Sequence, residues 1–236
     1  MKKKSYLTSL FILITLLLSG CMYPEEERAK NQIPYEDEIN RVQTAIKQYQ
    51  DETGGLLPIK TTEEDTPLFQ KYPIDFKKLV PKYMAEYPSN AFESGGVFQY
   101  VLIDVEDDPK VKLSDLRIAD EIRDITLRIR MEGYPPYKDN IGENVYSLDF
   151  SKIGYNDEPK AVSPFSGNEL SYVVTSDGEV FVDYRTDLMQ LMEAGDLKAE
   201  NSDIRFHLVE DSPFVPSYSL PYTIDEKKNE PIFLVN

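Results

Sequence analysis

The chain has 236 residues, and its 42 acidic and 26 basic side chains give it a net charge of −16. A surface this acidic repels nucleic acid and anionic lipid head groups, which excludes both as expected partners. It suits cations, basic proteins or a charged cell wall, and it also serves simply to keep an extracellular protein soluble.

The first twenty residues have the layout of an export signal. Residues 2–4 are lysines, and residues 7–18 form an apolar run that is short for a membrane span. The tetrapeptide Leu18-Ser19-Gly20-Cys21 follows, and it resembles the lipobox of bacterial lipoproteins. The resemblance implies that residues 1–20 are a signal peptide cut off before Cys21, and that the Cys21 thiol is lipidated. An uncleaved amino-terminal anchor is the alternative.

The rest of the sequence agrees with lipidation. Cys21 is the only cysteine, so it cannot form a disulfide within the chain. Loss of the three lysines changes the net charge from −16 to −19. Two acyl chains hold a protein stably on a membrane, so we expect a lipid-anchored protein on the extracytoplasmic face of the cell membrane. Residues 21–34 are charged and lack apolar periodicity, which predicts a tether.

A pattern in residues 72–113 returns twice along the chain. Its parts are a short leucine- or isoleucine-bearing segment, a turn such as Ser163-Pro164-Phe165, and a tyrosine-bearing apolar run. Self-similarity at this scale predicts units that must pack on one another to be stable. A single intergrown domain is the alternative. The predicted organisation is signal peptide 1–20, tether 21–34, unit one 35–113, unit two 114–185 and shortened unit three 186–236.

In unit one, a helix is predicted over residues 35–52. Apolar residues recur there at helical spacing, acidic residues occupy its first turn, and a Gly-Gly pair follows it. Pro73 is predicted to open a short helix. Residues 97–104 and 110–113 are predicted to be strands.

In unit two, Ser114 is the candidate N-cap of a helix whose apolar face includes Ile122, Ile125 and Ile129. Residues 125–131 also alternate like a strand, but the repeat favours a helix. Residues 148–153 are predicted to be a short helix. A hairpin is predicted from strands at 170–175 and 179–184, joined at Ser176-Asp177-Gly178.

In unit three, Thr186 is predicted to cap a helix that ends at Gly195. A final hairpin is predicted from residues 220–225 and 231–235. The match of Ser114-Asp115-Leu116 with Thr186-Asp187-Leu188 sets the predicted register of the repeat. The predicted fold is therefore α+β, with repeated helix, short helix and β-hairpin units and antiparallel sheets.

The segment from Ala45 to Pro58 resembles the helix end of type IV pilin and pseudopilin heads. The resemblance implies a similar fold for residues 35–113 and, more weakly, 114–184. The pilin processing site and helix glutamate are missing, so a pilus subunit is not expected. The whole chain resembles uncharacterised lipoproteins of spore-forming Gram-positive bacteria. That resemblance implies a surface location without a verified activity.

The sequence offers few residues for chemistry. His207 is the single histidine, and without a nucleophile motif it is interpreted as structural. Asp177 and Glu179 with Asp183 form the best candidate calcium site, although Asp-Gly is also an ordinary turn, and the turn alone is preferred. The acidic cluster Asp104–Asp108 is interpreted as a solvated loop. No catalytic residues, cofactor or metal are predicted.

Aromatic residues are the remaining candidates for binding. Tyrosine occurs 16 times, and five tyrosines are candidates to line a groove for a peptide, glycan or small solute, or else to pack the core. Proline-rich residues 213–221 are predicted to lie extended over the surface. The predicted function is an interaction module with an envelope protein partner. The alternative is a solute-binding lipoprotein of an ABC-type transporter, and an enzyme is not expected. The five tyrosines are Tyr134, Tyr137, Tyr184, Tyr218 and Tyr222.

Overall fold

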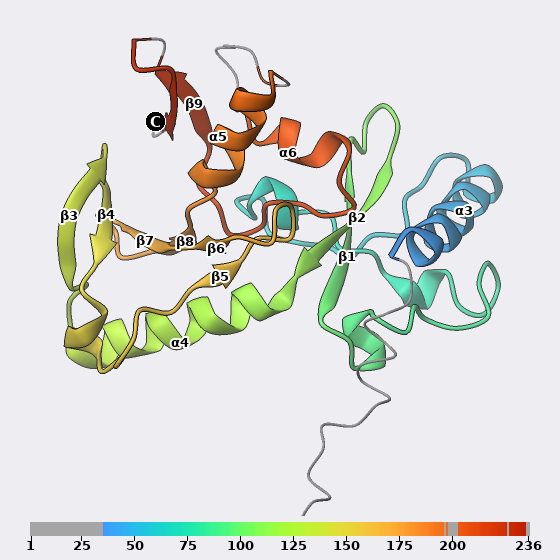
Figure 1. Cartoon of the computed structure of the whole chain (residues 1–236). Coiled ribbons are helices and arrows are strands. Elements are labelled where there is room, and N and C mark those ends of the chain that lie inside the picture. Colours follow the sequence, from blue (N-terminus) through green and yellow to red (C-terminus); the bar gives the residue numbers. More distant parts are fainter. Residues whose placement is uncertain (1–34, 196, 198–202, 226, 235–236) are drawn as a thin grey trace, which may run out of the picture. The chain divides into compact units, whose positions relative to one another are not determined.

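The computed structural model describes residues 35–195, 197, 203–225 and 227–234 (Figure 1). The predicted signal peptide 1–20, the lipidation site Cys21 and the tether 21–34 lie outside the described residues. None of the described helices is both long and apolar enough to cross a membrane.

The chain is α+β, with helices and several small antiparallel sheets, so the predicted fold class is confirmed (Figure 1). The described helices are α3 (Tyr35–Thr53), α4 (Leu116–Glu132), α5 (Arg185–Ala194) and α6 (Phe206–Glu210). Short 3-10 turns are η2 (Leu68–Gln70), η3 (Phe76–Lys78), η4 (Phe92–Ser94) and η5 (Phe150–Ile153). The strands are β1 (Phe98–Ile103), β2 (Lys110–Asp115), β3 (Tyr137–Gly142), β4 (Val145–Leu148), β5 (Ala161–Val162), β6 (Glu169–Leu170), β7 (Tyr172–Thr175), β8 (Val180–Val182), β9 (Tyr222–Asp225) and β10 (Glu230–Phe233).

Helix α3 packs against the β1–β2 hairpin. Val42 and Ile46 on its apolar stripe are fully buried, and acidic residues fill its first turn as predicted. The side-chain amide of Gln43 joins the helix to the hairpin through both its nitrogen and its oxygen. Its Nε2 donates to the Pro109 carbonyl at 2.8 Å, and its Oε1 accepts from the Val111 N–H at 2.8 Å.

Residues 116–132 form helix α4 and not the alternative strand, and the helix buries Ile118, Ile125 and Ile129 on one face. The predicted N-cap, Ser114, is wrong by one position. Asp115 caps the helix, and its carboxylate accepts from the Arg117 N–H at 3.0 Å. Ser114 instead lies buried at the end of β2.

The hairpin predicted in unit two belongs to a larger sheet. Strands β7 and β8 pair around the predicted turn, and β4 and β3 extend this pair in the order β3-β4-β7-β8 (Figure 1). The sequence did not indicate β3 and β4. The predicted short helices at Pro73 and at 148–153 are single 3-10 turns, η3 and η5.

An Asp-x-Arg pattern occurs three times in the described residues. In each copy the arginine main-chain N–H and guanidinium donate to the aspartate at 2.5–3.1 Å, and the guanidinium lies over a phenylalanine ring. The predicted match between residues 114–116 and 186–188 is wrong, since Thr186 lies inside α5 and does not cap it. The pairs are Asp115 with Arg117, Asp183 with Arg185, and Asp203 with Arg205.

Residues 213–221 are partly buried in a seam and do not lie over the surface as predicted. Leu113 in β2 donates its N–H to the Pro213 carbonyl at 2.9 Å and accepts from the Val215 N–H at 3.0 Å. The Ser217 hydroxyl donates to Ser114 Oγ at 2.7 Å. This polar seam joins the β1–β2 hairpin to the end of the chain, because β2 has an edge that only a later segment satisfies.

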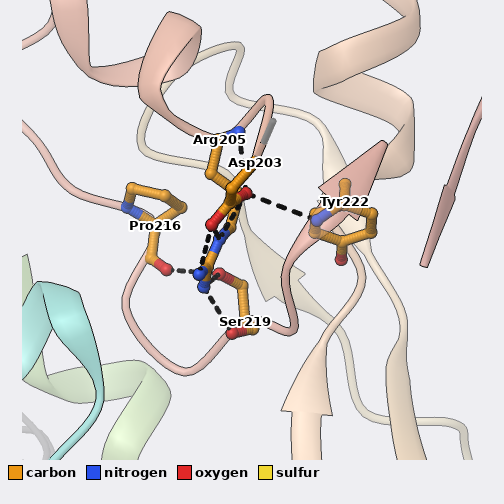
Figure 2. Close-up of polar contacts among 5 residues, drawn as sticks. All are labelled: Asp203, Arg205, Pro216, Ser219 and Tyr222. Carbon is orange, nitrogen blue, oxygen red and sulfur yellow. Dashed lines mark hydrogen bonds and ion pairs between the residues drawn. The ribbon is translucent and has the colours of Figure 1, made fainter. Parts of the chain in front are cut away.

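Arg205 also binds the segment of residues 213–221 (Figure 2). Its Nη1 donates to the Ser219 carbonyl at 2.7 Å, while its Nη2 pairs with Asp203 at 2.6 Å. The Ser219 hydroxyl in turn donates to the Pro216 carbonyl at 2.6 Å. A buried guanidinium thus satisfies the Ser219 carbonyl and holds this loop.

The buried apolar residues fall into clusters that cross the predicted units. One cluster joins α3 with β1 and β2, and another runs from Ile118 to Phe233 and so includes residues of units two and three. A small third cluster joins Phe69 and Val101 to Val209. Contacts hold Tyr35–Asn236 together as one compact unit. The boundaries at 113 and 185 stay predictions.

Candidate functional site

A cleft of about 810 Å³ lies between α4, the β7–β8 turn and the residues around η2. Its walls are largely apolar and aromatic, with polar groups at a few points. A cavity of this size and lining is typical of binding sites in proteins. The apolar wall residues are Ile122, Ile129, Tyr134, Pro135, Phe181 and Tyr218.

Local sequence explains why the cleft forms. Ile125 points α4 into the core, and helical geometry then places Ile122, Ile129 and Arg130 on the adjoining face that lines the cleft. Gly133 ends the helix with φ of 91°, which directs the chain into Tyr134-Pro-Pro. A side chain is absent at Gly178 where Pro135 approaches, and a Cβ there would lie 3.4 Å from the proline ring.

Helix α4 also carries exposed apolar side chains that do not line the cleft. Leu127 and Met131 are one helical turn apart on the outer face of α4, and Tyr134 follows at the helix end. Their exposed fractions are 55%, 80% and 57%. Exposed apolar side chains that form a patch are typical of a surface that binds another molecule, and Tyr134 is the member of this set that also lines the cleft.

The predicted tyrosine groove is correct in part. Tyr134 and Tyr218 line the cleft, and Tyr137 is exposed beside it, with its hydroxyl donating to the Ser176 carbonyl at 3.0 Å. Tyr184 and Tyr222 are fully buried, so for these two the alternative of packing in the core is confirmed and the groove is not. They are packed in the core, where the Tyr222 hydroxyl accepts the Tyr184 N–H at 2.9 Å, and burial raises the pKa of both phenols.

The hydroxyl of Tyr218 is a donor at neutral pH. Burial raises its pKa, and the charge of Asp120 adds to the effect. The cleft therefore presents a neutral phenol beside the carboxylates of Asp177 and Glu179 and the guanidinium of Arg130. This combination suits a ligand with apolar groups and hydrogen-bonding groups close together.

The candidate calcium ligands do not come together. Asp177 and Glu179 line the cleft, whereas Asp183 forms a two-point ion pair with Arg185 and lines a different cavity. Across the described ranges, no three or more His, Cys, Asp and Glu side chains form a group suited to hold a metal ion. His207 lies in α6, with its Nδ1 3.5 Å from Glu210 Oε1.

Sequence reasoning missed the outer face of α4. Leu127 and Met131 are four residues apart, which is one helical turn, and Tyr134 follows directly after the Gly133 that ends the helix. This spacing was hidden by the stronger isoleucine stripe on the inner face. Apolar residues on the face opposite the isoleucines are the signal that indicates an exposed apolar face in addition to the buried one.

These features define an α+β protein with an aromatic-lined cleft beside helix α4. Residues 35–115 match the family model described as the YphF family N-terminal domain. The match covers α3 and the β1–β2 hairpin, and most of the cleft lies beyond it. Neither the curated proteins nor the solved structures contain a match to this chain.

Proposed function

We propose that this chain is an extracytoplasmic interaction module, anchored to the cell membrane by lipid on Cys21, which binds an envelope protein through the cleft beside α4. The observation that carries the proposal is Tyr134, which lines the cleft and is also exposed, as are Leu127 and Met131 on the same helix. A small solute fills a cleft, but it does not cover an apolar row outside it. A protein partner covers both.

The chemistry of the surface indicates the partner. Aromatic and aliphatic walls favour an apolar or aromatic anchor side chain. The carboxylates Asp177 and Glu179 at the cleft, together with the net charge of −16, favour basic residues beside that anchor. We therefore propose a basic protein segment that inserts one apolar side chain.

The location rests on the sequence of residues 1–21. The basic start, the apolar run and Leu18-Ser19-Gly20-Cys21 resemble a lipoprotein signal, and the proposed kinship with uncharacterised Gram-positive lipoproteins would place the cleft outside the cytoplasm. The likeness of residues 35–113 to pilin heads would add only a fold analogy.

The lipid anchor is tested by Cys21→Ser in the full chain. Wild-type protein is expected in the membrane fraction with incorporated labelled fatty acid, and the variant is expected without label and in the soluble fraction or as unprocessed precursor. Labelled Cys21→Ser protein would contradict lipidation at this residue.

The cleft is tested by crosslinking in intact cells. A photo-crosslinking residue at position 131 is expected to give one discrete adduct, and the same residue at position 56, also exposed and apolar in the native chain, is expected to give none. Adding Phe181→Asp inside the cleft should abolish the adduct at position 131. Equal crosslinking from both positions, or an adduct insensitive to Phe181→Asp, would overturn the proposed interface.

One observation favours the alternative, a solute-binding lipoprotein of an ABC-type transporter. A second cavity, of about 410 Å³, lies beside α5 and contains a buried carboxylate, Asp187. Its size suits a small ligand.

A further inference from the structure

The cavity beside α5 is formed by two copies of the repeated Ser-Pro-Phe turn. Pro164 and Phe165 line it from one copy, and Ser212 and Pro213 line it from the other. Helix α5 contributes Asp187. No residue lines both this cavity and the cleft beside α4, so the two are separate sites.

The two turns have the same internal bond, which explains why they make similar walls. The Ser163 hydroxyl accepts the Phe165 N–H at 3.1 Å, and the Ser212 hydroxyl accepts the Phe214 N–H at 3.1 Å. Each serine thus fixes its own turn. In the first copy the same hydroxyl has a second role, because it also donates to Asp187 at 2.8 Å.

Asp187 is the unusual group of the cavity. Its exposed fraction is 2%, and the Ser166 hydroxyl donates to its second oxygen at 2.5 Å. Within the part of the chain that the structure describes, its hydrogen-bond partners are these two neutral serines, and no cation forms an ion pair with it. A buried carboxylate without a counter-charge is costly, and two hydroxyl donors offset only part of that cost.

The residues that line the cavity indicate which kind of ligand would supply the missing positive charge. Phe165, Leu191 and Leu208 give the cavity apolar sides, and Glu210 and Asp211 add carboxylates from α6 and the residue after it. A carboxylate has about four lone-pair positions, so the serines leave room for N–H donors. Apolar sides with a carboxylate suit a cation on an apolar stem.

We propose that this cavity binds an organic cation, an alkylammonium or alkylguanidinium group, whose charged head pairs with Asp187 and whose stem lies against Phe165 and Leu191. The ligand is either a free amine or guanidine or the lysine or arginine side chain of a protein. Both have the same head and stem, and the test separates them.

The pH dependence of binding follows from burial. Burial raises the pKa of Asp187 above its ordinary value of 3.8, although the bonds from Ser166 and Ser163 oppose the rise. The cation pairs with the ionised form, so affinity falls as the pH is lowered through this raised pKa and a proton is released on binding. The other titratable groups on the cavity are His207, Glu210 and Asp211, and the buried Tyr184 hydroxyl also senses the charge of Asp187.

The test is calorimetric titration of the full-length chain in detergent with butylamine, butylguanidine and the peptide Ala-Lys-Ala, with butanol as the neutral control. At neutral pH at least one cation is expected to bind saturably, and butanol is not. Asp187→Asn should weaken cation binding about tenfold or more. The control change Asp51→Asn, at an exposed carboxylate on α3 that lines neither cavity, should leave it unchanged. Affinity should fall as the pH approaches 3.8.

The outcomes are distinguishable. Tighter binding of a free cation assigns a solute site, and tighter binding of the lysine peptide assigns a protein side chain, and either supports the proposal. Absence of saturable binding by every cation, or equal affinity in Asp187→Asn, overturns it. If Asp187→Asn does not fold, wild-type titrations in two buffers of different ionisation enthalpy replace it, and binding at acidic pH without proton release overturns the proposal.

Discussion

Replacing Arg205 by methionine tests how the end of the chain is held (Figure 2). The guanidinium has an exposed fraction of 9%, pairs with Asp203 at 2.6 Å and donates to the Ser219 carbonyl at 2.7 Å. Methionine preserves much of the stem but leaves a carboxylate and a carbonyl without this donor. Breaking a buried ion pair costs about 3–5 kcal/mol. We expect the free energy of unfolding to fall by about 3 kcal/mol, at the lower end of this range. The reason is that Asp203 still accepts hydrogen bonds from the main-chain N–H groups of Arg205 and Tyr222.

Arg123→Met is the control. Arg123 pairs with Asp120 at 2.9 Å, the two side chains have exposed fractions of 79% and 67%, and solvent-exposed pairs contribute about 1 kcal/mol or less. Urea unfolding of residues 35–236, followed by circular dichroism, gives both free energies. Equal losses in the two variants, or a loss below about 1 kcal/mol for Arg205→Met, would refute the reasoning from burial.

Two further substitutions test the packing around β2 and η4. Lys112→Met should lower the free energy of unfolding by about 2 kcal/mol, because the main-chain carbonyls of Val209 in α6 and Ser212 after it lose their buried donor. The exposed Lys110→Met should change it by less than about 0.5 kcal/mol. Urea unfolding checks both, and similar losses would count against the buried lysine. Gly96→Ala places a Cβ 2.1 Å from the Asn90 carbonyl oxygen and should abolish cooperative thermal unfolding. Gly142→Ala meets a phenylalanine ring that is able to move and should be milder, and the reverse order would disprove the backbone clash.

The helices were predictable because their evidence is local. The stripes of α3 and α4 have helical spacing, and Gly133 marks the end of α4. The N-cap of α4 was predicted one residue early, since serine and aspartate are both favourable caps and sequence alone does not choose between neighbours. The error at Thr186 has the same origin, because it follows the Asp183 that satisfies the first turn of α5.

Strands β3 and β4 were not predictable because their evidence is tertiary. β3 consists of Tyr-Lys-Asp-Asn-Ile-Gly, whose side chains are exposed or half-buried, so it has no apolar alternation. Its place in the sheet depends on β4, which pairs with β7 more than twenty residues later. The seam of residues 213–221 has the same cause, since a free edge of β2 determines it.

The candidate site was predicted from residue types and corrected by burial. Tyr134 and Tyr218 reach the cleft, but Tyr184 and Tyr222 have the same side chain and lie in the core. A tyrosine suits either place, because it is both apolar and hydrogen-bonding. The sequence does not indicate that Asp187 is buried, because nothing local distinguishes a buried carboxylate from an exposed one in the first turn of a helix.

The claim that the α4 cleft is covered by a partner is tested most directly by radical footprinting. Side-chain oxidation is compared between native cell membranes and the purified chain in pure lipid vesicles. Met131 and Tyr134 are expected to oxidise more slowly in native membranes, while Phe92, which is exposed near the β1–β2 hairpin, oxidises at the same rate in both. Equal rates at all three residues in both preparations would contradict a bound partner at this cleft.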